Sequence, residues 1–392
     1  MNLKRIDKKF LARESSDDIE IVKSEGSFLY DSKGKKYIDF LMGWCVGNIG
    51  WGNKEIKKVI KNFDGPTYLK PEFLYKPWAE LAELLAKITP GKLQKSFRAT
   101  GGTEAVEIAL QVAMTYTKRS KFISIEGSYH GHSIGTMSIG YTEFRDKYSN
   151  LLPNCFKLSA PLDSKAADKL ETLLKNRDIA ALIMEPIICN LAVEIPQKEF
   201  MTHAQQLCKK YGTLLIMDEV ASGFYRTGKL FATGHFNLEP DIMCMAKGLS
   251  SGYAPIGATI VTKEIADGIE KEFDFYSTYG WHPLSTVATI ANIKYILKNS
   301  IKLEKNVNEM SEYFVNRLTN MKFKYTAEVR AQGLAIGVKF KDKNYASDLV
   351  KKAKKNGLLF NHINHGFIFF PALTIDQKTA KQGLDILEKV LR

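Results

Sequence analysis

Residues 213–262 read TLLIMDEVASGFYRTGKLFATGHFNLEPDIMCMAKGLSSGYAPIGATIVT, and this stretch decides the fold. It contains three short apolar runs, at 214–217, 242–245 and 256–261. Each run is too short for a helix and too continuous for a strand with one face in water, so each predicts a buried parallel strand. The chain is therefore expected to form an α/β fold around an open sheet.

Two reactive side chains follow these strands. Asp218 comes directly after the first run, and Lys247 comes two residues after the second. Ligands of open α/β sheets bind at the carboxyl edge, where both residues are expected to lie. An amine and a carboxylate at that edge suit a cofactor that needs a Schiff base and a paired ring nitrogen, and pyridoxal phosphate is such a cofactor.

Length and composition limit the class of protein. A chain of 392 residues with 45% hydrophobic content can bury a large core, and its length predicts two or three domains. It has no apolar run of 18 residues, and residues 1–18 lack the apolar core of a signal peptide, so neither a membrane span nor secretion is expected. Five scattered cysteines without CxxC spacing predict reduced thiols in a cytoplasmic protein, with neither disulfides nor a metal site.

The charge argues against nucleic-acid binding. The formal net charge is +13, but only ten of the 56 basic residues are arginine, and the lysines are spread along the whole chain. Nucleic-acid binders concentrate their charge and favour arginine, whereas dispersed lysines are typical of a solvated surface.

Three further segments add candidate ligand-binding groups at the same sheet edge. A helical pattern begins at Gly102-Thr103, and a glycine-rich helix start can hold a phosphate, although a simple turn is the commoner explanation. Tyr129 follows an expected strand at 121–126 and could stack on a cofactor ring or be a packed loop residue. Glu185 ends another buried run at 181–187, and the helix expected over 197–211 leads into the opening stretch, which gives a doubly wound β-α-β pattern.

The two ends of the chain differ from this centre. Residues 26–40 predict a hairpin, and the following glycine-rich segment holds Trp44, which either packs in the core or forms an aromatic wall of a substrate pocket. The last hundred residues predict a helix at 301–319, one strand at 330–340, a helix at 345–356, a strand at 366–370 and a final helix after 376, typical of a smaller α+β domain.

Taken together, MDEVASGFYRTGKLFA, DIMCMAKGLSSGYAPIGA and STYGWHPLSTVA resemble motifs of the class III aminotransferases, the ornithine and ω-amino-acid group of fold-type I pyridoxal-phosphate enzymes. The resemblance covers about residues 26–376. It implies a large cofactor-binding domain over 49–286 and a small domain built from 1–48 and 287–392. It also implies a homodimer with active sites shared between the subunits.

The resemblance assigns roles to individual residues. Lys247 matches the lysine that forms the Schiff base with the cofactor and later moves the substrate proton; burial and the nearby cofactor are expected to lower its pKa. Asp218 matches the aspartate that pairs with the pyridine nitrogen. Val220 and Tyr129 match residues on the two faces of the ring.

The remaining cofactor contacts are implied in the same way. Gly102 and Thr103 match the phosphate cup, and Thr278 matches the threonine that reaches the phosphate from the partner subunit. Glu185 matches a glutamate near the hydroxyl side of the cofactor.

The departures from the family concern the substrate. Many members that use ornithine, acetylornithine or 4-aminobutyrate have an arginine where Ile368 stands and a glutamate where Asn190 stands. The arginine and the glutamate are expected to be absent together, because removing one partner of a buried ion pair costs roughly 3–5 kcal/mol of stability. The region of Trp44 instead resembles ω-transaminases that act on amines, and Arg330, expected in a turn, is the candidate cation for a keto-acid carboxylate. Gln is usual where Ala221 stands.

Three functions follow from these observations. The first is an aminotransferase that passes an amino group from an amine or amino acid to a keto acid or aldehyde by a ping-pong mechanism. The second is an aminomutase, decarboxylase or racemase on the same scaffold. The third is a basic regulatory or nucleic-acid module on an inactive enzyme, against which the intact Lys247 and Asp218 argue.

Overall fold

The computed structural model describes residues 3–12, 19–342, 344–363 and 365–392. Its largest element is a seven-stranded sheet with the strand order β4-β10-β9-β8-β7-β5-β6. The strands are β4 (Leu93–Ala99), β5 (Lys121–Ile125), β6 (Cys155–Leu158), β7 (Ile179–Met184), β8 (Leu214–Asp218), β9 (Ile242–Met245) and β10 (Gly257–Thr262). This large, mainly parallel sheet confirms the predicted fold class.

One of the predicted strand directions is wrong. Strands β5 to β9 pair in parallel, but β10 runs antiparallel to both β9 and β4. The reason lies in the connection, because residues 246–256 contain only a short 3-10 helix, η3 (Lys247–Leu249). A parallel return needs a crossover, usually a full helix, so this loop turns the chain straight back.

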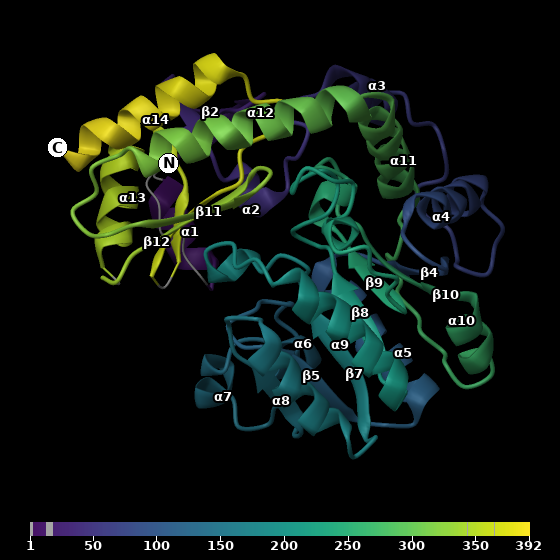
Figure 1. Cartoon of the computed structure of the whole chain (residues 1–392). Helices are drawn as coiled ribbons and strands as arrows, with labels where there is room; N and C mark the ends of the chain where they lie inside the picture. Colours follow the sequence, from purple (N-terminus) through teal and green to yellow (C-terminus); the bar gives the residue numbers. More distant parts are fainter. Residues whose placement is uncertain (1–2, 13–18, 343, 364) are drawn as a thin grey trace.

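Helices cover both faces of the large sheet, because successive strand residues point to opposite sides. In β7, Ala181 and Ile183 join the apolar cluster of α5 (Gly102–Thr117). Leu182 and Met184 join the opposite cluster, formed with α8 (Ser164–Leu174) and α9 (Lys198–Tyr211). Figure 1 shows α5, α8 and α9 around these strands. The continuous apolar runs of the sequence are thus explained by burial on two sides.

Two smaller sheets combine the ends of the chain. Their orders are β1-β2-β3-β13 and β11-β12-β15-β14. The strands are β1 (Ile21–Glu25), β2 (Phe28–Asp31), β3 (Lys36–Asp39), β11 (Glu328–Gln332), β12 (Ala335–Lys339), β13 (Leu358–Leu359), β14 (Asn361–Ile363) and β15 (Gly366–Phe369). β13 pairs in parallel with β3, with Leu358 opposite Ile38, so a strand from the last quarter of the chain completes an N-terminal sheet.

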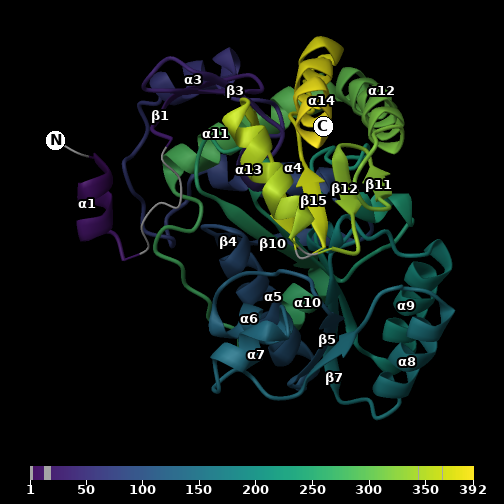
Figure 2. The ribbon, with the colours of Figure 1, turned by 90° about the vertical axis from the view of Figure 1, so that its left-hand side faces the viewer.

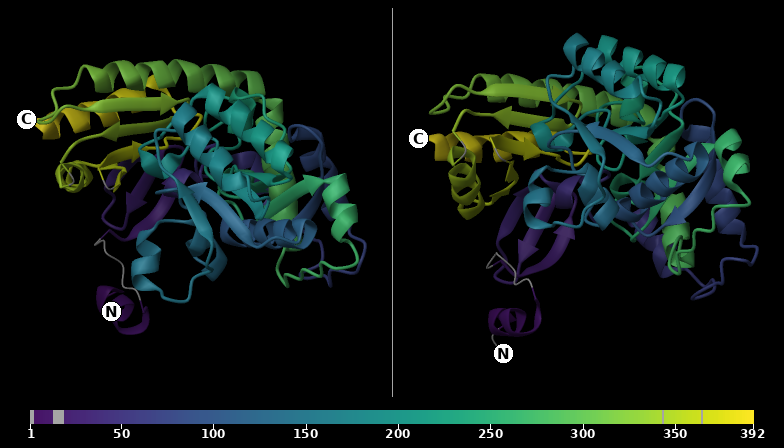
Figure 3. Two further views of the ribbon diagram at one scale, coloured as in Figure 1. Left: turned by 60° about the horizontal axis from the view of Figure 1, so that its bottom comes forward. Right: turned by 90° about the horizontal axis from the view of Figure 1, so that it is seen from below.

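The other helices surround these sheets. They are α1 (Leu3–Phe10), α2 (Met42–Cys45), α3 (Lys54–Lys61), α4 (Lys76–Ile88), α6 (Ile134–Ile139), α7 (Glu143–Lys147), α10 (Lys263–Ile269), α11 (Pro283–Lys298), α12 (Ser300–Thr319), α13 (Tyr345–Lys355) and α14 (Gln377–Leu391), with 3-10 helices η1 (Cys189–Leu191) and η2 (Ala232–His235). Figure 2 shows α12 and α14 beside one another over the C-terminal strands. Helix α1 has no buried residue and stands apart from the body in both views of Figure 3. None of the described helices is both long and apolar enough to cross a bilayer.

The strand expected over 330–340 is in fact a hairpin. β11 and β12 pair antiparallel, with Gln332 opposite Ala335, and the turn between them contains Gly333 at φ +57°. A Cβ atom on Gly333 would lie 2.4 Å from the backbone carbon of Thr227, so only glycine fits this turn.

Candidate active site

A cavity of about 240 Å³ opens at the carboxyl edge of the large sheet. It collects residues that follow β5, β7, β8 and β9, together with the start of α5 and two segments from the chain ends. Its lining residues are Trp44, Cys45, Gly102, Thr103, Tyr129, His130, Gly131, Glu185, Cys189, Asn190, Asp218, Val220, Ala221, Lys247 and Phe370. Ten residues were predicted from the sequence as catalytic, cofactor or substrate contacts; the structure brings eight of them to one cavity and leaves Thr278 and Arg330 outside it.

Asp218 is the last residue of β8 and is held in a fixed orientation. Its Oδ1 accepts a hydrogen bond from the backbone N–H of Val220 at 3.0 Å. Its Oδ2 lies 2.7 Å from Nδ1 of His130, and the other ring nitrogen of His130 lies 3.0 Å from the hydroxyl oxygen of Ser128. All of these side chains except Val220 are buried. A carboxylate fixed in this way can hold a proton on a ring nitrogen that faces it.

His130 was not among the residues predicted from the sequence. The signal was its position after β5, next to Tyr129, because residues that follow neighbouring parallel strands meet at one edge. Its partner Asp218 lies 88 residues away, so the pairing itself could not be inferred from spacing.

Lys247 is the first residue of η3 and lies at φ +41°. Its Nζ lies 3.5 Å from Sγ of Cys45. Burial lowers the pKa of Lys247, but the neighbouring Cys45, Cys189, Glu185 and Asp218 raise it by more, so the pKa is raised overall. The expected lowering is therefore not produced by the protein groups alone.

Glu185 follows β7 and is the least satisfied group of the cavity. Its side chain is 3% exposed. Its Oε2 accepts a hydrogen bond from the backbone N–H of Cys189 at 3.3 Å, whereas its Oε1 has no hydrogen-bond partner among the described residues. Burial, and then the charge of Asp218, raise the pKa of Glu185 to about 8. A buried polar atom without a partner indicates a place for a ligand atom.

The start of α5 is open toward the cavity. Gly101 precedes the helix and caps it with no side chain, so N–H groups of the first turn remain available to an anion. A Cβ atom on Gly102 would lie 2.9 Å from Cγ1 of Val220, so glycine is required there. The predicted helix start at Gly102 is confirmed, and Thr103 adds a hydroxyl beside it.

Aromatic rings form the mouth of the cavity. Trp44 is 42% exposed and Tyr129 is 39% exposed, and the ring of Tyr129 lies 6.1 Å from that of Tyr141. Trp44 and Asn190 also line a neighbouring cavity of about 480 Å³, which gives a long substrate room to extend outward. The stacking of Tyr129 on a ring and the contact of Trp44 with a substrate stay predictions.

The segment that carries Trp44 has an unusual backbone. Residues 42–45 have φ values of +48°, +60°, +66° and +51°, so this short turn has left-handed φ values throughout. Only Gly43 adopts that conformation without cost, and such strain persists where the surroundings enforce it. It places Trp44 and Cys45 against the cavity.

The two remaining predicted residues lie elsewhere. Thr278 is exposed on the loop between α10 and α11. Arg330 is in β11 and not in a turn, and its guanidinium pairs with Glu194 and, at 2.7 Å, with Glu328. Two carboxylates already neutralise Arg330, and its role toward a substrate stays a prediction.

The positions of the family's arginine and glutamate carry no charge. Ile368 lies in β15 with its side chain fully buried in the apolar cluster below the cavity, and Asn190 lines the cavity. Arg226 is also fully buried, but it donates to the carbonyl oxygens of Leu334 at 3.1 Å and Pro371 at 2.6 Å. Among the residues that the structure describes, no arginine lines the cavity.

The donor set of the cavity fits pyridoxal phosphate. An amine, a fixed carboxylate and a glycine-rich helix start correspond to the aldehyde, the pyridine nitrogen and the phosphate of that cofactor. The unpartnered Oε1 of Glu185 leaves one further polar position for the ligand. A metal does not fit, since the described residues contain no group of three His, Cys, Asp or Glu side chains that could hold one.

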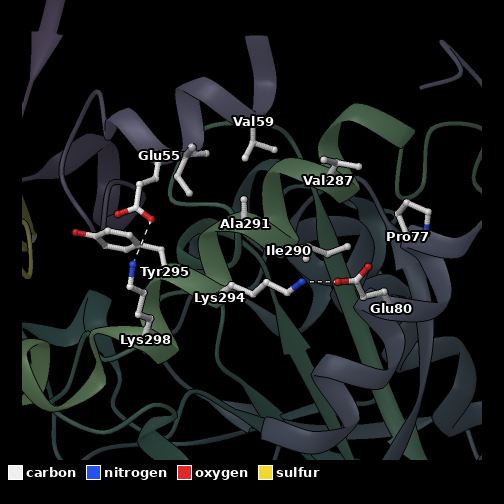
Figure 4. Close-up of a pocket in the computed structure, with 11 residues that line it drawn as sticks. Glu55, Val59, Pro77, Glu80, Val287, Ile290, Ala291, Lys294, Tyr295 and Lys298 are labelled. Carbon is white, nitrogen blue, oxygen red and sulfur yellow. Dashed lines mark hydrogen bonds and ion pairs between the residues drawn. The ribbon is translucent and has the colours of Figure 1, made fainter. Parts of the chain in front are cut away.

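A second groove lies away from this chemistry, between α3, α4 and α11 (Figure 4). Its charged side chains are already paired, with Lys294 bonded to Glu80 at 2.6 Å and Lys298 facing Glu55 at 4.0 Å. Between them the groove is lined by apolar residues such as Val59 and Ile290, so it offers neither a reactive group nor a spare charge.

Comparison with known proteins agrees with this geometry. The family described as Aminotransferase class-III matches residues 11–391. An adenosylmethionine-8-amino-7-oxononanoate aminotransferase of Staphylococcus aureus is 32% identical, over 95% of this chain and 92% of the relative. An acetylornithine aminotransferase of Archaeoglobus fulgidus is 33% identical, over 98% and 99%. Among solved structures, the taurine:2-oxoglutarate aminotransferase of Bifidobacterium kashiwanohense, in complex with PLP and glutamate, is similar with a TM-score of 0.90 and 27% identity, covering 97% of this chain and 94% of that one.

Proposed function

The chain belongs to the class III aminotransferases, which depend on pyridoxal phosphate, and from this premise we propose that it takes the amino group from an amine or a compact apolar amino acid and passes it to a keto acid. The observation that carries the proposal is the cavity in which Lys247 and Asp218 meet, with no arginine among the described residues that line it.

The residues of the cavity have distinct tasks in this proposal. When bound, pyridoxal phosphate supplies an electrophilic carbon and an electron-withdrawing ring. Lys247 holds the cofactor through its Nζ and, when released, moves a proton to and from the substrate carbon. Asp218, oriented by His130 and by the Val220 N–H, keeps the pyridine nitrogen protonated.

Other residues hold the cofactor in place. Gly102 and Thr103 bind its phosphate at the positive end of α5. Tyr129 and Val220 enclose the ring and exclude water from its faces. The support for these roles is the shared cavity and the match of each residue to the family motif.

The choice of donor follows from the missing charges. A carboxylate gains about 1.5–3 kcal/mol from each hydrogen bond to a charged partner. Ile368 and Asn190 provide no such partner at the positions where many relatives have one, while Trp44 offers apolar contact. Hydrophobic amines and compact apolar amino acids are therefore the favoured donors.

A homodimer with shared active sites is part of the proposal. The support is a group of exposed large side chains on the two loops 62–75 and 270–282, next to the exposed Thr278. Its members are Tyr68, Phe73, Leu74, Tyr276 and Tyr279. Tyr68 and Tyr276 bring the two loops together, with their hydroxyl oxygens 3.4 Å apart. Burying these rings against a second copy brings Thr278 to the partner's phosphate site.

Domain limits and location complete the proposal. The large domain spans 49–286 and the small domain 1–48 and 287–392, which is supported by the sheets: every strand of the large sheet lies in the first range and every strand of the smaller ones in the other two. A cytoplasmic location is supported by five cysteines that are all free thiols.

The experiment that tests the function uses the holoenzyme and a panel of amine and amino-acid donors with pyruvate or 2-oxoglutarate as acceptor. A donor should bleach the visible absorbance of the resting enzyme, and a keto acid should restore it with formation of the new amino acid. Irreversible bleaching, or release of carbon dioxide or an isomerised amino acid without a keto acid, would instead support a decarboxylase, aminomutase or racemase.

A further inference from the structure

Glu185 presents an unused polar atom to the active-site cavity. Its side chain is 97% buried, and its Oε1 has no hydrogen-bond partner among the described residues. The other oxygen, Oε2, is satisfied by the backbone N–H of Cys189 at 3.3 Å. Leaving a buried acceptor unpaired is costly, so Oε1 is expected to have a partner when the cavity is filled.

The surroundings of Glu185 disfavour its ionised form. Asp218 lines the same cavity and carries a negative charge fixed by His130 and by a backbone N–H. Lys247 opposes this effect with its positive charge, Cys189 stabilises the anion through its N–H, and Tyr141 and the thiol of Cys189 face Glu185 as neutral groups. Burial is the largest influence, and the balance raises the pKa of Glu185 to about 8.

A cofactor attached to Lys247 shifts this balance further. An anionic oxygen of the bound ligand, placed against Oε1, repels an ionised Glu185 but accepts a hydrogen bond from a neutral one. The second carboxyl group beside Asp218 therefore keeps its proton at neutral pH, because two like charges in one dry site repel.

From this geometry we propose that Glu185 is a neutral carboxylic acid that donates a hydrogen bond from Oε1 to an anionic oxygen of the ligand in the cavity. This inference rests on the proposed use of the cavity as the cofactor site. Such an oxygen can come from the hydroxyl of the cofactor ring or from the carboxylate of a substrate. In either case Glu185 provides polar recognition in a cavity whose lining, over the described part of the chain, contains no arginine.

The amide variant tests whether Glu185 acts as a neutral hydrogen-bond donor or as a charged hydrogen-bond acceptor. Glu185→Gln keeps a hydrogen-bond donor of the same length but cannot ionise, whereas Glu185→Ala removes the group. Two affinities are measured at pH 7: that of the apoenzyme for pyridoxal phosphate and that of the holoenzyme for a carboxylate-bearing donor. We expect one of them to stay within about threefold of the parent in Glu185→Gln and to fall by about tenfold or more in Glu185→Ala.

The pH dependence gives a second measurement. Between pH 7 and 9 the parent loses its donor and gains a negative charge near the ligand, so its affinity falls through the pKa of Glu185, near 8. Glu185→Gln should keep its affinity over this pH range. If Glu185 had only a structural role, the parent and the variant would not differ in this way. The exposed Glu312→Gln is the matched control, since it makes the same change of charge on α12.

Spectra and KM values show whether the anionic oxygen belongs to the cofactor or to the substrate. Spectra of the resting holoenzyme from pH 6 to 10 are recorded without substrate, so a transition above pH 8 that Glu185→Gln removes assigns the cofactor's oxygen. A difference seen only in the KM of alanine, and not of an amine of similar size without a carboxylate, assigns the substrate.

Three results would overturn the inference. One is Glu185→Gln being as impaired at pH 7 as Glu185→Ala while its unfolding temperature matches the parent, because an ionised carboxylate would then be required. Another is Glu185→Ala behaving like the parent in both readouts. The third is the same pH dependence in Glu185→Gln and the parent. Cofactor binding is measured without any donor, so these results stay distinguishable from a failure of the proposed donor class.

Discussion

The Nδ1 atom of His130 lies 2.7 Å from Oδ2 of Asp218, and this pair joins the end of β5 to the end of β8 inside the active-site cavity. Both side chains are buried, so the hydrogen bond is shielded from water. It fixes the carboxylate that is expected to face the cofactor ring.

Replacing His130 should weaken cofactor binding. In His130→Ala, Asp218 keeps only its bond to the Val220 N–H and is no longer held in one orientation. We expect the affinity of the apoenzyme for pyridoxal phosphate to fall by about tenfold or more, the effect of a lost hydrogen bond to a charged group. Titration of the apoenzyme measures this, with the exposed His203→Ala as control. An unchanged affinity would show that Asp218 needs no support from the ring.

Lys247→Ala should abolish turnover and the visible absorbance of the resting enzyme, because Lys247 supplies the one lysine amine among the described residues that line the cavity. The chain should still fold, as judged by circular dichroism, since the one hydrogen bond of Nζ among the described residues is the weak one to Cys45. The exposed Lys263→Ala serves as control. Substantial remaining turnover in Lys247→Ala would contradict the assignment.

The active enzyme should be a dimer. Sedimentation at assay concentration should give twice the chain mass, and Thr278→Val should weaken pyridoxal phosphate binding because a phosphate partner from across the interface is lost. Thr326→Val, which changes an exposed threonine on the small domain, should not. A fully active monomer would refute both the interface and the role of Thr278.

Donors with a distal carboxylate should react slowly. Ile368 and Asn190 offer no charged partner, so acetylornithine, ornithine and 4-aminobutyrate are expected to be poorer donors than a hydrophobic amine or a compact apolar amino acid. Single-turnover bleaching rates with each donor test this. If acetylornithine or 4-aminobutyrate were fastest, the carboxylate site would lie elsewhere, with Arg330 as the first residue to examine.

Arg226 should matter for stability. Its guanidinium joins the two ends of the fold by donating to the carbonyl oxygens of Leu334 and Pro371 and to the side-chain oxygen of Asn48. Arg226→Met leaves buried acceptors unpaired, each at about 1–3 kcal/mol, so the free energy of unfolding in urea should fall by at least that amount. Arg317→Met breaks only partly exposed ion pairs and should cost less than about 1 kcal/mol. Equal effects would contradict this account.

The sequence alone was enough to place the reactive side chains that follow buried strands. Lys247, Asp218 and Glu185 could be placed at one sheet edge because each follows a buried apolar run, and the structure puts all three around one cavity. The helix start at Gly102 followed from helical periodicity.

The sequence alone could not predict features that depend on contacts between distant segments or on the conformation of a loop. The direction of β10 depends on a loop without a crossover helix, which apolar content does not reveal. The raised pKa of Lys247 arises from Cys45, Cys189, Glu185 and Asp218, which reach it only in the folded chain. The hairpin of β11 and β12 was missed because its turn, Gly333-Leu334, has one glycine and no Asn, Asp or Pro to mark it.

The pairing of β13 with β3 has a consequence for synthesis on the ribosome. Ile38 leaves the ribosome more than three hundred residues before its partner Leu358, so the N-terminal sheet waits with one edge uncovered while the large sheet is already complete. Unpaired strand edges attract other chains, and long-range pairing is slow. Phe370, which closes the active-site cavity, arrives later still. A nascent chain therefore acquires its cofactor pocket only near the end of translation, and truncation before residue 358 should give an aggregating product rather than a smaller enzyme.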